Sequence, residues 1–326
     1  MERLRSLLDE DGTNVDVQTA WARHLVWRKQ QPAVIRVRQG LVLRQGREIS
    51  PLREVSAPRS AAVQLLLLAI FENQCREARR DGFRTPVPLH QPDAQSETAW
   101  IYLLGLPTTD RTDERTQARL PTENRLEQLK NALDRLKKCG RVELQPEQIR
   151  GRYENFGLLN EEKGNRGGTI HYKAPGPNES TIDIPVNFFL QGWVHTLEDN
   201  EIIAYLFLLH QAKLHPELNN GGPGIPLTRF AWQEAYGKSR AYESYRMLSR
   251  YGLIKIKRDD RRLANGTVAG LRSSGEQQRI ATEPHRYWVD ATALQQQANP
   301  AVTSGIERFL NGENLEHANW GFFGAQ

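Results

Sequence analysis

Positively charged side chains gather in one segment of the chain, where they could bind a polyanion. The chain of 326 residues has 44 Lys and Arg against 39 Asp and Glu, a formal net charge of +5. Between Ile225 and Asp290 there are 13 Lys and Arg against seven Asp and Glu, a net charge of +6, so the remaining residues together carry −1. Contact with a phosphate backbone requires such a concentration of cations. This segment is therefore the first candidate for a nucleic-acid contact.

A helix is expected from Ser239, stopped by Gly252, and one of its faces is polar. At about 100° per residue, Ala241, Tyr245 and Leu248 point inward. The outward face and its flanks carry the candidates for contact with a major groove: Lys238, Ser239, Arg240, Glu243, Arg246, Met247 and Arg250. Arg can hold guanine with two hydrogen bonds, and the N-terminal residues of such a helix usually reach the bases first. Ser239 and Arg240 are the foremost candidates, although an isolated face of this composition is more commonly a solvated surface.

A basic hairpin is expected directly after this helix. LIKIKRD alternates as a strand does, a long polar loop spans Asp259 to Pro284, and HRYWVD reads as the returning strand. Its cations suit phosphate or minor-groove contacts, which position a protein more than they select a sequence. These candidates are Lys255, Lys257, Arg258, Arg261 and Arg262.

The elements before this helix complete a familiar order. TIDIPVNFF is a short extended segment, Thr196 is an expected N-cap for LEDNEIIAYLFLLHQAKL, and LTRFAWQEAYG forms a second helix. Through FAWQEAYGKSRAYESYRMLSRYGLIKIKRD, the chain resembles the winged helix-turn-helix superfamily of DNA-binding domains. The resemblance implies a winged-helix DNA-binding domain over residues 182–290, with duplex DNA as its partner.

The first half resembles the same superfamily more weakly. Helices are expected over 60–80 and from Thr122 to Cys139, followed by a strand and by the hairpin FGLLNEEKGNRGGTIHYK. We expect a first winged-helix-like domain over 58–173 and a linker over 174–181. The outward face of the second of these helices has mixed charge and would gain little from phosphates. Its Asn124 and Asn131 could read adenine, and a scaffold or homodimer role is at least as well supported. That face carries Asn124, Glu127, Asn131, Asp134 and Lys138.

Two terminal segments flank these units. Residues 1–57 are expected to form an extension, with a helix around Thr19 to Gln30 and a hairpin turning at Gly40. Residues 291–326 form a tail with a short helix near Ser304 to Asn311 and an aromatic end, NWGFFGAQ. That end either packs on the body of the protein or binds a protein partner.

Other classes of protein are disfavoured. The most apolar run, Ala61 to Phe71, is far shorter than the roughly 20 residues of a membrane-spanning helix. Cys75 and Cys139 lack metal-ligand spacing and fit a cytoplasmic protein. The GKS at 237–239 lacks the first glycine of a phosphate-binding loop. We therefore expect no enzyme, no metal and no cofactor.

The sequence thus predicts an α+β protein with two tandem winged-helix domains, an N-terminal extension and a C-terminal tail. The expected function is sequence-specific binding of double-stranded DNA, foremost as a transcriptional regulator and as a dimer. The tandem arrangement is also similar to plasmid replication initiators, so initiation of DNA replication on a plasmid or mobile element is one alternative. A winged-helix protein-interaction module that does not bind DNA is the other.

Overall fold

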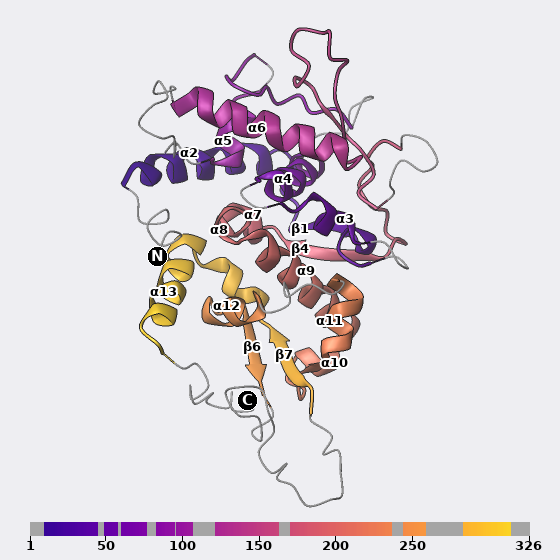
Figure 1. Ribbon diagram of the computed structural model, residues 1–326, viewed down its shortest axis with the longest axis vertical. Coiled ribbons are helices and arrows are strands. Elements are labelled where there is room, and N and C mark those ends of the chain that lie inside the picture. Colours follow the sequence, from indigo (N-terminus) through magenta and orange to yellow (C-terminus); the bar gives the residue numbers. More distant parts are fainter. Residues whose placement is uncertain are drawn as a thin grey trace, which may run out of the picture.

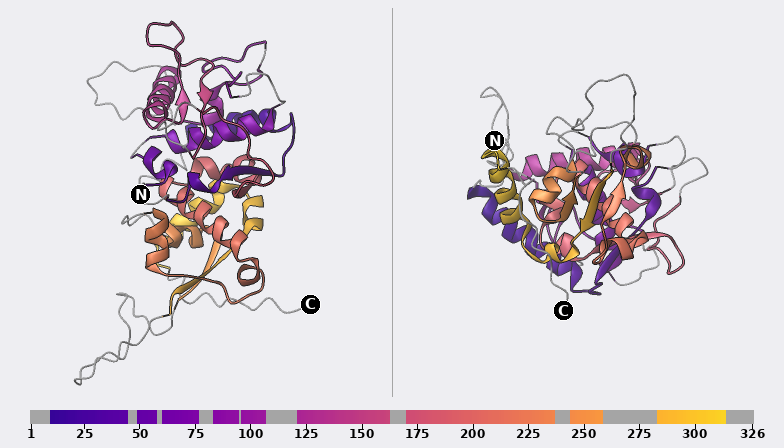
Figure 2. Two further views of the ribbon diagram at one scale, coloured as in Figure 1. Left: turned by 90° about the vertical axis from the view of Figure 1, so that its right-hand side faces the viewer. Right: turned by 90° about the horizontal axis from the view of Figure 1, so that it is seen from below.

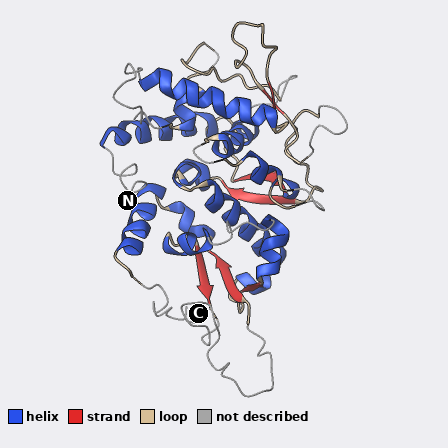
Figure 3. Cartoon of the chain, in the orientation of Figure 1, coloured by secondary structure: helices blue, strands red, loops and turns tan. Residues whose placement is uncertain are grey.

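The computed structural model confirms the mixed α+β class, with many helices and small antiparallel sheets (Figures 1 and 3). It describes residues 10–44, 49–57, 60–76, 83–94, 96–106, 121–162, 170–236, 244–258 and 283–313. The first half of the chain occupies the upper part of Figure 1 and the second half the lower part. Among the described residues, no helix combines the length and apolar character needed to cross a membrane.

The first half is built around a helix that is buried on all sides. Residues Leu65 to Phe71 of this helix are at most 3% exposed, because apolar side chains occupy nearly every position. The elements of this half are α2 (Glu10–Trp27), β1 (Val34–Arg38), η1 (Gln39–Leu41), α3 (Pro51–Val55), the buried helix α4 (Ala62–Cys75), α5 (Trp100–Leu104), α6 (Pro121–Lys138), β2 (Val142–Glu143) and β3 (Gly157–Leu158).

The second half is built around a helix that begins with a capping box. Glu198 and Glu201 bond reciprocally to the main chain there, which satisfies N–H groups that have no partner within the helix. The elements of this half are β4 (Thr181–Pro185), α7 (Asn187–Leu190), α8 (Trp193–Thr196), the capped helix α9 (Asp199–Leu214), α10 (Pro216–Asn219), β5 (Ile225–Leu227), α11 (Arg229–Tyr236), α12 (Tyr245–Arg250), β6 (Ile254–Lys257), β7 (His285–Val289), η3 (Ala291–Gln295) and α13 (Ala298–Leu310).

Both halves place the same kinds of element in the same order. In the second half, the central helix α9 is followed by the short helix α10, β5, α11, α12, β6 and β7, and the sheet order is β5-β7-β6. In the first half, α4 is followed by Arg84, which bridges β3 at Gly157, then by α5, α6, β2 and β3. Because Gly157 also pairs with Glu143 of β2, the last strand is again the middle one.

The last helix before each hairpin ends in the same way. Gly252 has φ 81°, and Leu253 N donates to Leu248 O at 3.1 Å. After α6, Gly140 has φ 67°, and Arg141 N donates to Leu136 O at 2.8 Å. This is the glycine-terminated helix end known as the Schellman motif. The chain reverses there and enters β2 or β6 directly.

The N-terminal stretch differs from the expected hairpin. Val34–Arg38 pairs antiparallel with Thr181–Pro185, while Gln39–Leu41 is a 3₁₀ turn. The alternation of VIRVR is that of a strand, but its partner lies more than 140 residues away, which no local pattern reveals. The N-terminal extension is therefore hydrogen-bonded to the strand that follows residues 174–180.

The interior of the two halves forms one continuous apolar core. Trp100 and Trp193, one from each half, are fully buried within it. His195 links the halves further, because its Nε2 bonds to the carbonyl oxygen of Leu103 at 2.8 Å and its Nδ1 lies 3.1 Å from Arg23 Nη1. These bonds and the shared core hold the second half against the first (Figure 2).

Candidate nucleic-acid interface

An aromatic cluster positions α12 on the sheet of the second half. Tyr245 packs edge to face on Tyr287 of β7, with ring centres 5.5 Å apart, and Trp232 of α11 lies 5.7 Å from the same ring. Tyr245 and Leu248 are 4% and 0% exposed, as their helical spacing predicted. Tyr251 O–H donates to Glu201 Oε1 at 3.0 Å, which fixes the end of α12 against α9.

The described candidates on α12 lie in three different environments. Arg246 is exposed, with its guanidinium 6.0 Å from the centre of the Tyr245 ring. Met247 is half-buried and packs on the core. Arg250 is half-buried too, and its guanidinium lies 5.0 Å from the centre of the Phe309 ring of α13. Among these three, Arg246 is the side chain best placed to reach a groove.

The outward face of the sheet β5-β7-β6 carries the cations of the expected wing. Lys257 lies opposite Arg286, and Lys255 lies opposite Trp288. Opposed residues of antiparallel strands share a face, so these four side chains project on the same side. The other side carries Ile254, Tyr287 and other core residues. The exposed side chain of Lys257 and the half-buried side chain of Lys255 therefore stand on a basic surface.

Arg286 and Trp288 were missed as site residues by the sequence reasoning. Trp288 is held in place because its Nε1 donates to Gly222 O at 3.0 Å and its ring packs against Gly224, which has φ 87°. The alternation of HRYWVD could have revealed both, since Arg286 and Trp288 occupy its polar register. The sheet order in space, which pairs them with the lysines, could not be read from the sequence.

Of the remaining candidates, only Arg258 lies within the described residues. Arg258 follows β6 and is half-buried. Lys238, Ser239, Arg240, Glu243, Arg261 and Arg262 fall in segments that the structure does not describe. The assignment of these residues to DNA contact stays a prediction.

The corresponding helix of the first half, α6, has the mixed face that its sequence predicts. Glu127, Asn131 and Lys138 are exposed. Asp134 accepts hydrogen bonds from Tyr153 O–H at 2.8 Å and from Arg152 Nη2 at 3.0 Å. Its carboxylate is thus engaged by the segment between β2 and β3, and this face offers no excess of positive charge.

A buried ion pair fixes the segment after β3 to the N-terminal strand. Glu161 is 0% exposed and accepts from Arg38 N at 3.1 Å and from Arg38 Nη1 at 2.8 Å. Arg38 also bonds to Glu179. Burial raises the pKa of Glu161, and the positive charge of Arg38 opposes that rise. These contacts join β1, the segment after β3 and the segment before β4 into one unit.

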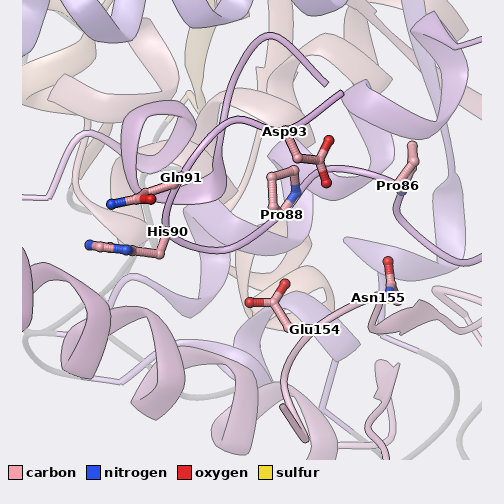
Figure 4. A pocket seen from close by; sticks show the side chains of 7 residues that line it. All are labelled: Pro86, Pro88, His90, Gln91, Asp93, Glu154 and Asn155. Carbon is pink, nitrogen blue, oxygen red and sulfur yellow. The ribbon is translucent and has the colours of Figure 1, made fainter. Parts of the chain in front are cut away.

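An open hollow of about 440 Å³ lies on the first half (Figure 4). Its carboxylates are used by the loops that form it, because Asp93 Oδ1 accepts from Ser96 N at 2.9 Å and Glu154 Oε2 accepts from Leu89 N at 3.2 Å. Throughout the described ranges, no three His, Cys, Asp or Glu residues gather as a metal site would require. The hollow is lined by Pro86, Pro88, His90, Gln91, Asp93, Glu154 and Asn155.

Comparison with known proteins adds no further assignment. No family model, curated protein or solved structure matches this chain.

Proposed function

We propose that this chain is a sequence-specific double-stranded DNA-binding protein, most directly a transcriptional regulator, built from two tandem winged-helix units. The second unit reads the DNA. The observation that carries the proposal is the basic outward face of the β5-β7-β6 sheet, where Lys255, Lys257 and Arg286 project, in the same unit whose helix α12 exposes Arg246. Phosphates along both edges of a groove are the natural ligands of such a surface.

The position of each basic side chain indicates whether it contributes to base recognition or to general affinity for DNA. Arg246 projects from the helix that would enter the major groove, so it contributes to base recognition. Lys257 projects from a strand of the wing, so it contributes to affinity for all sequences. The mixed face of α6 suits the first unit to a scaffold or homodimer role.

The repeated order of elements favours one alternative, a replication initiator of a plasmid or mobile element. Both halves carry a central helix, two further helices and a hairpin whose last strand also pairs on its other side, with β5 in the second half and with Arg84 in the first. Such tandem units can occupy successive turns of one DNA site. A regulator should protect a short inverted repeat, whereas an initiator should protect several direct repeats beside an AT-rich tract.

Selection of binding sites from random duplexes tests the proposal. The full chain should enrich one defined motif, and footprinting on the DNA beside its own gene should then show one of the two arrangements. Recovery of no motif, together with no duplex affinity, would instead support a winged-helix module that binds proteins.

A further inference from the structure

Two arginines meet where α12 and α13 both end. Arg308 Nη2 donates to the carbonyl oxygen of Arg250 at 2.6 Å. Arg250 Nη1 in turn donates to the carbonyl oxygen of Glu313 at 3.1 Å, and Phe309 lies under its guanidinium. Each guanidinium has five N–H groups, so these bonds orient both side chains and leave donors for a further acceptor.

The charges at this point are mostly of one sign. Burial, and then the positive charges of Arg308 and Arg258, lower the pKa of Arg250, while Glu313 and Tyr251 act in the opposite direction. The guanidinium of Arg250 therefore interacts with two others, that of Arg308 on α13, which is bonded to the end of α12, and that of Arg258 after β6. An anion placed among them would relieve their mutual repulsion.

Helix α13 is a fixed part of the second unit. Gly305 packs against the buried ring of Tyr251, so closely that a Cβ at this position would lie 2.6 Å from Cδ1 of the ring. The segment leading into α13 is anchored too, because Trp193 Nε1 donates to Leu294 O at 3.3 Å and Ala298 N donates to Gln191 O at 2.9 Å. Helix α13 thus lies at a defined place beside α12 (Figure 1), and Arg308 is bonded to the end of α12.

The arginines extend a line of cations along α12. Arg246 and Arg250 are four residues apart and so share a face of the helix. Arg308 continues that line onto α13, beyond the end of α12. A helix whose N-terminal part lies in a major groove brings its other end toward the phosphates at the groove's edge.

We propose that Arg250 and Arg308 form a binding site for the DNA phosphodiester backbone, which makes α13 part of the interface. This inference rests on the proposed binding of duplex DNA. Arginine suits the role because its planar fork can hold two phosphate oxygens at once. The site would hold the protein on all sequences alike and would carry no base preference.

The test is the affinity of the full chain for fluorescent duplexes over a series of salt concentrations. One duplex carries the selected motif and the other is random. Arg308→Gln should weaken binding to both duplexes by the same factor and reduce the slope of log K against log salt by about 1, as the loss of one phosphate contact does. Arg308→Lys, which keeps the charge, should retain most of the slope.

A matched control is Arg28→Gln. Arg28 belongs to the first half, is exposed and bonds to Glu97 at 2.5 Å, so its loss removes one positive charge outside the second unit. This control should leave the slope unchanged. Thermal melting shows whether Arg308→Gln folds. Arg250→Gln, which keeps the main-chain carbonyl that Arg308 binds, supplies an independent variant with the same expected loss.

Three results would overturn the inference. An unchanged slope for folded Arg308→Gln and Arg250→Gln would do so while leaving the proposed function intact. If Arg308→Gln weakened binding only to the duplex with the selected motif, Arg308 would position α12 and would not hold phosphate. Salt-independent or absent duplex binding by the unmodified chain would remove both this inference and the proposed function.

Discussion

Replacement of Gly305 by alanine tests the packing of α13 on α12. A Cβ at this position would lie 2.6 Å from Cδ1 and 3.0 Å from Cε1 of Tyr251, and 3.2 Å from the carbonyl oxygen of Arg250. The ring cannot move aside easily, because it is 2% exposed and its hydroxyl is bonded to Glu201. The added methyl group therefore pushes α13 away from α12.

The expected change in the free energy of unfolding is a balance of two effects. In an open helical position, alanine is more stable than glycine by about 1 kcal/mol. Overpacking of a tight contact costs about 1–3 kcal/mol, so its central value of about 2 kcal/mol exceeds the gain in helix propensity. Gly305→Ala should thus lower the free energy of unfolding by about 1 kcal/mol.

Urea unfolding followed by circular dichroism measures this change. Ser304→Ala is the matched control, since Ser304 is exposed on the same helix and its replacement should stabilise the chain by about 0.5 kcal/mol. If Gly305→Ala instead gained about 1 kcal/mol, position 305 would behave as an open helical site, and the close packing of α13 on Tyr251 would be refuted.

Two further predictions concern the titration of His195 and the buried ion pair of Glu161. Burial, and then the charge of Arg23, lower the pKa of His195 to about 3, below its usual 6.5. The unfolded chain therefore binds the proton more tightly, and stability is lost as pH falls from about 6.5 toward 3, by about 2 kcal/mol at pH 5. Urea unfolding at pH 5 and 7 should show this loss, and His195→Gln should reduce it; identical pH dependence in both proteins would contradict the assignment. Separately, Glu161→Gln should cost about 3 kcal/mol because Arg38 loses its buried partner, whereas Glu179→Gln, on the exposed side of the same arginine, should cost much less. Equal losses in the free energy of unfolding, measured by urea unfolding of the two variants, would disprove the buried ion pair.

The local pattern of the sequence predicted the helices and hairpin of the second half well. Periodic apolar residues and terminal glycines located α9, α11 and the end of α12, and alternation located β6 and β7. The first residue of a helix was harder to predict, because several neighbouring polar residues can serve as its N-cap. Thr196 was expected to cap α9, but it ends α8, and Glu198 takes the cap because Glu201 completes a capping box with it.

Long-range pairings escaped prediction because nothing local encodes them. The pairing of β1 with β4 depends on the whole fold. The short strand β5 follows a Gly/Pro-rich loop and was predicted as part of that loop. The helix expected near Ser304 to Asn311 begins earlier, at Ala298, because its first turn packs on the core around Val302. Arg308 was therefore read as part of a tail and missed as a site residue.

The most direct test of DNA binding is the salt dependence of duplex affinity, measured by fluorescence anisotropy on the full chain. Log K should fall linearly as log salt rises. Lys257→Ala should lower the slope by about 1 and weaken all sequences alike, while Arg246→Ala should cost about 1–3 kcal/mol mainly on the selected motif. A chain with no salt-dependent affinity for any duplex would contradict the proposal that its second half binds DNA.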